Sequence, residues 1–132
     1  LTAMDPAPGT HAPFDLHVDA RAPLPPFDLA VLACPIDAYD AWMGRLAAEA
    51  PGRPVTDVGS VKRLPHALAR AHGLTSFAGG HPMAGGSRPG HERATATLFE
   101  GRIWFVTTDG ATAAAVQAAR ALATGCGGRV VE

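Results

Sequence analysis

Residues 57–62 read DVGSVK, and residues 79–85 read GGHPMAG. Each motif follows a short run that is typical of a β-strand, at residues 53–57 and 75–78. In an open α/β sheet the carboxyl ends of parallel strands meet at one edge, and ligands bind beyond that edge. The motifs therefore predict that a hydroxyl, an ammonium and an imidazole lie together at one edge of a sheet; they belong to Ser60, Lys62 and His81.

Strand-like and helix-like segments alternate along the chain. We expect strands at residues 1–5, 15–19, 28–35, 53–57, 75–78, 102–108 and 129–131, and helices at 37–50, 61–72 and 110–124. The apolar run 28–35 is typical of a strand buried on both faces, and residues 79–101 are expected to form a glycine-rich loop. This order predicts an α/β fold with a mostly parallel sheet and helices on both faces.

Three helix starts can be assigned from the sequence. Asp37 is a candidate N-cap for the first helix and Ser60 for the second, while Asp109 or Gly110 opens the third. Pro65 would then fall inside the second helix and remove one of its backbone hydrogen bonds. We therefore expect a distorted first turn near Ser60.

Composition excludes several classes of protein. The chain has 132 residues, a formal charge of −1 and a pI near 6.6, so it fits one domain and lacks the basic surface that nucleic-acid binding requires. No signal sequence and no apolar run of about eighteen residues occurs, which predicts a cytoplasmic protein with no membrane partner. The two cysteines, Cys34 and Cys126, match no zinc or redox spacing, so no metal site is expected.

His81 is the strongest candidate for a catalytic residue. An imidazole titrates near neutral pH and can accept the proton of a hydroxyl that is being oxidised to a carbonyl. Pro82 restricts the backbone next to it, and Gly79, Gly80 and Gly85 would allow a tight loop. The alternative is a histidine on a surface loop without a chemical role.

The first motif offers further candidates, each with a structural alternative. The Ser60 hydroxyl can cap a helix, or it can bond an imidazole or a substrate hydroxyl. Lys62 is either a solvated lysine in the first helical turn or a cation that faces an anionic ligand. Asp57 can orient the turn that follows it through its side-chain oxygens.

The pattern D-x-G-S-x-K followed by G-G-H-P-M-x-G resembles the prephenate and arogenate dehydrogenases. The resemblance covers residues 28–131 and is strongest at 54–90. It implies a Rossmann-like NAD(P)-binding domain and the oxidative decarboxylation of prephenate to 4-hydroxyphenylpyruvate, a step of tyrosine biosynthesis. Arogenate dehydrogenase is an alternative, and so is a non-catalytic fragment of such an enzyme. A β-hydroxyacid-type dehydrogenase is less well supported, because it would not carry the second motif.

The resemblance also implies roles for individual residues. His81 and Ser60 would be catalytic, with His81 bonding the ring hydroxyl of the substrate. Substrate binding would involve Ser60, Lys62, His81 and Gly85. The cofactor would lie against Asp57, Gly59 and the backbone of Ala33, Cys34 and Pro35.

Asp5 is a candidate for contact with the adenosine ribose. In dinucleotide-binding folds an acidic residue at the end of the second strand bonds that ribose, and this favours NAD over NADP. A turn aspartate before Pro6 is the alternative.

No G-x-G-x-x-G sequence occurs in the chain, which also begins with Leu1. We therefore expect residues 1–132 to be a partial NAD(P)-binding domain that lacks its first βα unit, which would lie upstream. The family also has a helical C-terminal region with an arginine that holds a substrate carboxylate, and Glu132 stops before it. That region implies a homodimeric full-length parent.

Overall fold

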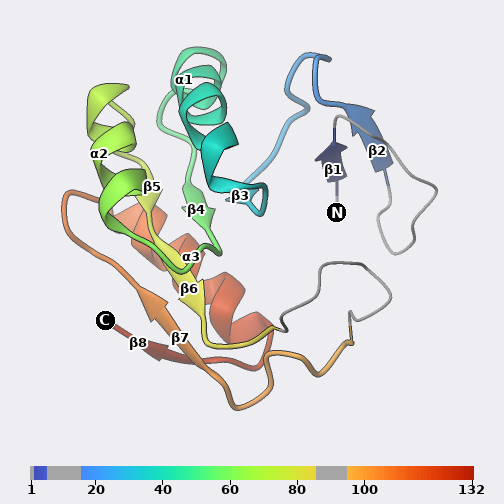
Figure 1. Ribbon diagram of the computed structural model, residues 1–132, viewed down its shortest axis with the longest axis vertical. Coiled ribbons are helices and arrows are strands. Elements are labelled where there is room, and N and C mark those ends of the chain that lie inside the picture. Colours follow the sequence, from blue (N-terminus) through green and yellow to red (C-terminus); the bar gives the residue numbers. More distant parts are fainter. Residues whose placement is uncertain (1, 6–15, 86–94) are drawn as a thin grey trace.

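The computed structural model describes residues 2–5, 16–85 and 95–132 (Figure 1). Within these residues the strands are β1 (Thr2–Asp5), β2 (Leu16–Asp19), β3 (Ala30–Leu32), β4 (Val55–Asp57), β5 (Phe77–Ala78), β6 (Gly80–Pro82), β7 (Ile103–Val106) and β8 (Arg129–Val131). The helices are the 3₁₀ turn η1 (Ile36–Ala38) and the α-helices α1 (Tyr39–Glu49), α2 (Arg63–Ala71) and α3 (Ala113–Gly125).

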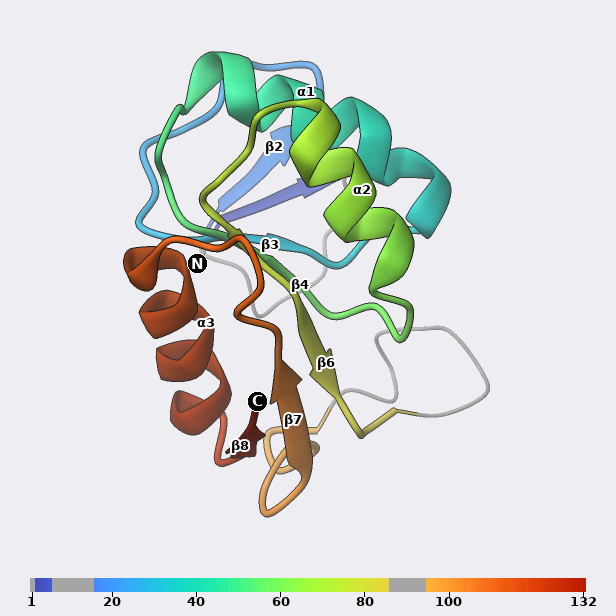
Figure 2. The same cartoon turned by 90° about the vertical axis from the view of Figure 1, so that its left-hand side faces the viewer.

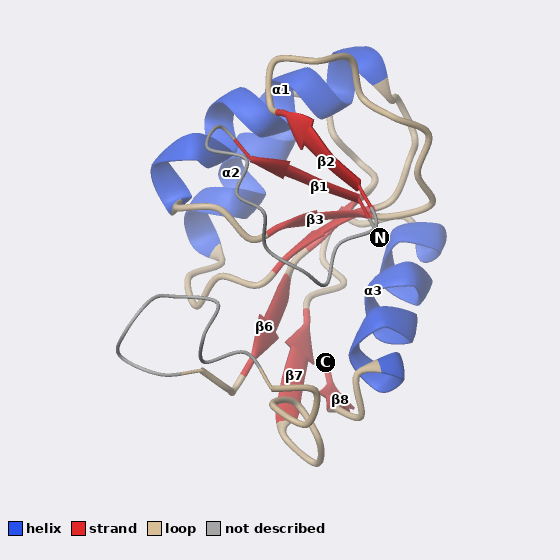
Figure 3. Cartoon of the chain, turned by 90° about the vertical axis from the view of Figure 1, so that its right-hand side faces the viewer, coloured by secondary structure: helices blue, strands red, loops and turns tan. Residues whose placement is uncertain are grey.

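Parallel pairing dominates the described strands. β3, β4 and β5 form one parallel sheet, in which Leu32 pairs with Asp57 and Thr56 pairs with Ala78. β6 pairs with β7 in the antiparallel sense, and β7 pairs with β8 in the parallel sense. Only Gly79 separates β5 from β6, so this short segment joins the two sheets (Figure 3). β1 and β2 pair in parallel with each other as a separate ribbon.

Helices pack on both faces of β4 and β5. α1 and α2 lie on one side of these strands and α3 lies on the other (Figure 2). The two successive residues of β5 illustrate the arrangement, because side chains alternate along a strand. Phe77 belongs to the core with α1 and α2, whereas Ala78 packs against α3. These observations confirm an α/β fold with a parallel sheet and helices.

The sheet β6–β7–β8 is covered differently. Trp104 and Val106 of β7 are buried against the alanines of α3 at spacing i, i+4, namely Ala115, Ala119 and Ala123. Phe105, between them, points to the opposite face and is 39% exposed. Only one face of this sheet is therefore closed by a helix within the part of the chain that the structure describes.

The expected helix starts are wrong. α1 begins after η1 with Ala38 as its N-cap, α2 begins at Arg63 after Lys62, and neither cap makes a side-chain hydrogen bond. Because α2 begins two residues later than expected, Pro65 lies in its first turn, where the missing N–H has no helical partner to lose. The third helix begins after Thr112, whose hydroxyl accepts a hydrogen bond from the Ala115 N–H.

Two further expectations are corrected by the structure. The predicted loop 79–101 contains a strand, β6, because residues 80–82 pair with β7. The run 28–35 shortens to β3, and Val31 is 40% exposed instead of buried, since the main contacts of α3 are with β4, β5, β7 and β8. Residues 1 and 15, at the starts of the first two predicted strands, lie outside the described part.

Across the three described ranges, no helix is both long enough and apolar enough to span a membrane.

Candidate functional site

Three segments leave the parallel strands at the same edge of the sheet. Residues 33–35 follow β3, residues 58–60 follow β4, and residues 79–81 follow β5. The Val58 N–H donates to the Leu32 carbonyl over 3.3 Å, which holds the first two loops together. The structure thus brings the two sequence motifs to one edge, as the pattern of strands predicts.

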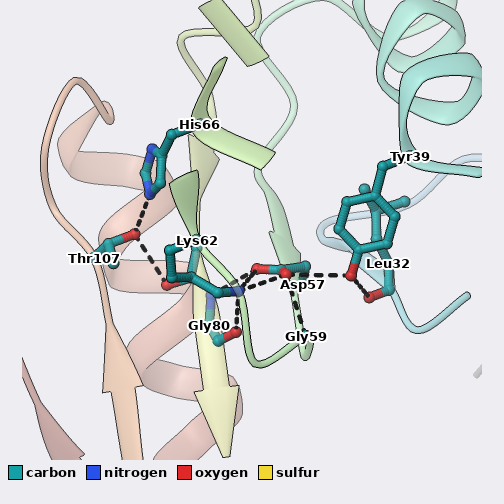
Figure 4. Close-up of polar contacts among 9 residues, drawn as sticks. Leu32, Tyr39, Asp57, Gly59, Lys62, His66, Gly80 and Thr107 are labelled. Carbon is teal, nitrogen blue, oxygen red and sulfur yellow. Dashed lines mark hydrogen bonds and ion pairs between the residues drawn. The ribbon is translucent and has the colours of Figure 1, made fainter. Parts of the chain in front are cut away.

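Asp57, the last residue of β4, is the centre of the site. Its side chain is fully buried, and its carboxylate accepts hydrogen bonds from the backbone N–H of Gly59 at 3.2 Å and of Gly80 at 2.9 Å (Figure 4). The Lys62 ammonium lies 2.5 Å from both carboxylate oxygens. The expected turn-orienting role of Asp57 therefore has a direct basis in the bond to Gly59, and the bond to Gly80 extends it to the second motif.

Lys62 is turned inward. Its ammonium also donates to the Gly80 carbonyl over 2.6 Å, and its side chain is 20% exposed. Burial lowers the pKa of Lys62, and the neighbouring Asp57 carboxylate opposes that change. Lys62 is thus not the solvated lysine of a first helical turn; its contact with an anionic ligand stays a prediction.

Tyr39, the first residue of α1, completes the network around Asp57. Its hydroxyl lies 3.2 Å from the Leu32 carbonyl and 3.2 Å from Asp57 Oδ2. Burial and the Asp57 charge raise the pKa of Tyr39 well above its usual value, so the phenol stays protonated and can donate. In the sequence, helical spacing identifies Tyr39 only as a core residue. Its polar role could have been inferred from the rule that a buried tyrosine hydroxyl requires a hydrogen-bond partner.

His81 lies on the open face of the second sheet. It is the middle residue of β6, is half-buried, and pairs with Phe105 of β7 at a ring-centroid distance of 6.3 Å. Ser60 is exposed and follows β4 by three residues. Among the described residues no hydrogen bond joins Ser60 to His81, and their catalytic roles stay predictions.

Gly79 and Gly80 are required by close packing, and neither has a positive φ. A Cβ on Gly80 would lie 2.5 Å from the Asp57 carbonyl oxygen, and one on Gly79 would lie 2.7 Å from Thr107 Oγ1. The expected tight loop is therefore wrong at these two positions. Gly85 does have a positive φ of 126° and is exposed.

The Cα of Gly59 also faces the protein interior. A Cβ there would meet Asp57 Oδ2 at 3.1 Å and the Tyr39 hydroxyl at 3.2 Å. This packing explains the glycine, while the predicted approach of its backbone to a cofactor stays a prediction.

The remaining cofactor candidates lie at strand ends. Ala33 and Pro35 are exposed after β3, and Cys34 between them is half-buried. Burial raises the pKa of the Cys34 thiol, so the thiol stays protonated at neutral pH. Asp5 ends β1, as expected for a ribose ligand, and that role stays a prediction.

A second polar contact links α2 to the end of β7. The Thr107 hydroxyl donates to the Gly79 carbonyl over 3.3 Å and lies 2.7 Å from His66 Nε2, from which it can accept a hydrogen bond when that nitrogen carries the proton (Figure 4). His66 also contacts the edge of Phe77 at a centroid distance of 5.3 Å. Across residues 2–5, 16–85 and 95–132, no cluster of three or more His, Cys, Asp or Glu side chains could hold a metal ion.

Comparisons with known proteins agree with this arrangement. The family described as "Prephenate dehydrogenase, nucleotide-binding domain" matches residues 14–132. No curated protein matched the chain. Among solved structures, prephenate dehydrogenase from Aquifex aeolicus is 29% identical with a TM-score of 0.71, over 79% of this chain and 38% of that one.

Two further structures are similar. The Aquifex aeolicus enzyme in complex with hydroxyphenyl propionate and NAD+ is 29% identical with a TM-score of 0.70, over 79% of this chain and 37% of that one. Arogenate dehydrogenase from Synechocystis has a TM-score of 0.72 at 24% identity, over 89% of this chain and 43% of that one, which shows a shared fold. The chain spans 37–43% of the length of these proteins. It belongs to the prephenate dehydrogenase family and carries the nucleotide-binding domain of that family.

Proposed function

We propose that this chain provides the NAD(P)-binding part of a dehydrogenase that converts prephenate to 4-hydroxyphenylpyruvate, with arogenate as the alternative substrate. The observation that carries the proposal is the meeting of residues 33–35, 58–60 and 79–81 at the carboxyl ends of three parallel strands. That edge is where open α/β sheets bind nucleotides and substrates. His81 lies there with its side chain on the sheet face that no described helix covers.

The residues at this edge fit the nicotinamide end of the cofactor. Ala33 and Pro35 are exposed and small, so a cofactor could lie against them beside the end of β4. When bound, NAD(P)+ accepts a hydride from the substrate. Asp5 at the end of β1 would bond the ribose hydroxyls, which favours NAD over NADP, and a relative has been solved with NAD+.

His81 would act on the substrate hydroxyl. As the hydroxyl-bearing ring carbon loses its hydride, the imidazole accepts the hydroxyl proton and a carbonyl forms. The bond to the ring carboxylate then breaks and carbon dioxide leaves. Its electrons complete the aromatic ring and turn the carbonyl oxygen into a phenolate, which takes a proton back from the imidazolium and becomes the hydroxyl of the product. Ser60 would orient the same hydroxyl, and Gly85 would lie beside the substrate.

The replacement His81→Asn tests this assignment in an active enzyme that carries the domain. Asparagine keeps a polar group but cannot accept the proton, so we expect turnover to fall roughly 10²–10⁴-fold, the usual contribution of a general base. NAD+ affinity should stay within about twofold, because the prediction places His81 on the substrate. Unchanged turnover in His81→Asn would refute the assignment of His81. If the unmodified enzyme converts arogenate but not prephenate, arogenate is the substrate.

A non-catalytic role is tested by calorimetric titration of the 132-residue chain with NAD+ and NADP+. The sequence contains no G-x-G-x-x-G turn for the pyrophosphate, so we expect very weak binding by the chain alone. Micromolar binding would contradict a non-catalytic fragment directly. Preference for NAD+ that is lost in Asp5→Asn would support the ribose assignment.

A further inference from the structure

We propose that Asp57, Lys62 and Tyr39 are positioning residues that fix the separation between Ser60 and His81, and that Lys62 acts through this network instead of binding the substrate. The inference rests on the proposed function for the roles of Ser60 and His81. Its structural part concerns only contacts within the chain. The central contact is the pair of backbone N–H groups that the Asp57 carboxylate accepts.

These two N–H groups come directly before the two predicted catalytic residues. Gly59 precedes Ser60, and Gly80 precedes His81. The buried Asp57 carboxylate therefore bonds the residue before each predicted catalytic side chain. The distances are 3.2 Å to the Gly59 nitrogen and 2.9 Å to the Gly80 nitrogen. A movement of Asp57 would change the position of Ser60 relative to His81.

The geometry of the sheet explains why Gly80 needs these partners. The Gly79 carbonyl accepts from the Thr107 N–H, and the Met83 N–H donates to Ile103, so residues 79 and 83 face β7. In an antiparallel pair the intervening residue 80 faces the other way. β4 ends at Asp57 on that side, so no further strand residue is available there to bond Gly80.

The side chains of Asp57 and Lys62 provide the hydrogen bonds that a neighbouring strand would otherwise make to Gly80. The Gly80 N–H donates to Asp57, and the Gly80 carbonyl accepts from Lys62 over 2.6 Å. Both backbone groups of the residue before His81 are thus bonded by one ion pair. A larger residue than glycine would not fit, because its Cβ would lie 2.5 Å from the Asp57 carbonyl.

Tyr39 fixes the ion pair from the opposite side. Its hydroxyl lies 3.2 Å from both Asp57 Oδ2 and the Leu32 carbonyl, so its single proton is shared between the ion pair and the end of β3. The donors around Asp57 therefore come from α1, from the turn after β4, from the start of α2 and from β6. With its ammonium bonded to Asp57 and Gly80, Lys62 directs its charge into the protein.

NMR spectroscopy of the 132-residue chain tests the network without any turnover. Lys62 is the only lysine in the sequence, so its Cε signal is assigned unambiguously. We expect the variant Lys62→Met to shift the Gly80 and Gly59 amide signals and to speed hydrogen exchange at Gly80 at least tenfold. Exchange at Met43 and Leu46 in the core follows global stability and gives the reference, so Gly80 should speed up by a larger factor than these two residues. Arg63→Met, which removes an exposed charge from the next residue, is the matched control and should move neither glycine.

The variant Tyr39→Phe gives a second test if Lys62→Met does not fold. It removes one hydroxyl from Asp57 and keeps the packed ring, so the Gly59 and Gly80 amide signals should shift relative to the unmodified chain while the fold is retained. Unchanged glycine signals in every folded variant would overturn the proposed network.

Steady-state kinetics in an active enzyme separates positioning from substrate binding. We expect Lys62→Met to lower kcat roughly a hundredfold, as an ångström-scale displacement of a catalytic group does, and to leave KM within about threefold. A large rise in KM with kcat retained would overturn the proposal and make Lys62 a substrate ligand. If His81→Asn keeps its turnover while the NMR result holds, the proposed function fails and the network remains.

Discussion

The two halves of the core, the sheet β3–β4–β5 and the sheet β6–β7–β8, differ in how many of their faces are covered by helices. In β4 every residue is buried, because α1 and α2 cover one face and α3 covers the other. In β7 burial alternates, and Phe105 on the uncovered face is 39% exposed. His81 lies on the open face of the second half, where it is half-buried. Asp57 lies at the junction between the two halves.

The largest expected effect comes from breaking this junction. Asp57→Ala leaves the Lys62 ammonium without its counterion and removes the acceptor for two backbone N–H groups. Removing one partner of a buried ion pair costs about 3–5 kcal/mol, a large part of the stability of a small domain. Urea denaturation followed by circular dichroism measures the change. A loss of less than about 1 kcal/mol would show that the buried pair does not hold the two halves together.

Two phenylalanines compare the halves directly. Phe77 of β5 is 2% exposed and packs in the core with residues of α1 and α2. The replacement Phe77→Ala should therefore destabilise the chain by about 3–5 kcal/mol. Phe105→Ala removes the same side chain from the open face and should cost about 1 kcal/mol or less. Both are measured as shifts of the urea midpoint at constant m-value. Equal losses would mean that the β6–β7–β8 face is covered in solution.

A smaller effect is expected at the strand that connects the halves. Gly80→Ala introduces a methyl group 2.5 Å from the Asp57 carbonyl, so the backbone must move, at about 1–3 kcal/mol. Gly125→Ala is the matched control, because no atom lies within 4 Å of its Cβ position. Urea midpoints compare the two variants. If Gly80→Ala is as stable as Gly125→Ala, the close packing between β4 and β6 is not rigid.

The sequence predicts the positions of β3, β4 and β5 in one half and of β7 and β8 in the other, and among the described strands of these two sheets it misses β6. Strands around residues 53–57 and 75–78 are found where the pattern places them, because local preference and burial agree there. β6 could not be predicted, since Gly-Gly-His-Pro has little strand preference of its own and pairs only because β7 lies beside it. Tertiary structure decides that strand.

The candidate site shows the same division. The motifs predict that Ser60, Lys62 and His81 lie at one edge of the sheet, because strand ends are visible in the sequence. The inward direction of Lys62 depends on the Gly80 carbonyl eighteen residues away, and Tyr39 enters from another helix. Spacing along the chain contains no information on either contact. The Lys62–Gly80 and Tyr39–Asp57 contacts can be recognised only in the folded structure, in which β6 lies beside the end of β4.

The smallest expected effect concerns the second link between the halves, where His66 on α2 meets Thr107 after β7. Burial lowers the pKa of His66 below its usual 6.5, and the Lys62 charge adds to this, whereas Asp109 and Asp57 oppose it and Arg70 reinforces it. The unfolded chain therefore binds the proton more readily than the folded chain, and stability falls as pH decreases through about 6.5.

The replacement His66→Gln isolates this contribution. Glutamine can still donate to Thr107 Oγ1 but does not titrate, so the urea midpoint of the variant should fall less between pH 7.5 and 5.5 than that of the unmodified chain. Above pH 7.5 the difference between the two midpoints should no longer depend on pH, because the imidazole is neutral in both folded and unfolded states. An identical pH dependence in the two proteins would mean that the imidazole is as well solvated as in the unfolded chain. The contact between α2 and β7 would then be open to water, and Asp57 would remain as the buried polar link between the two halves.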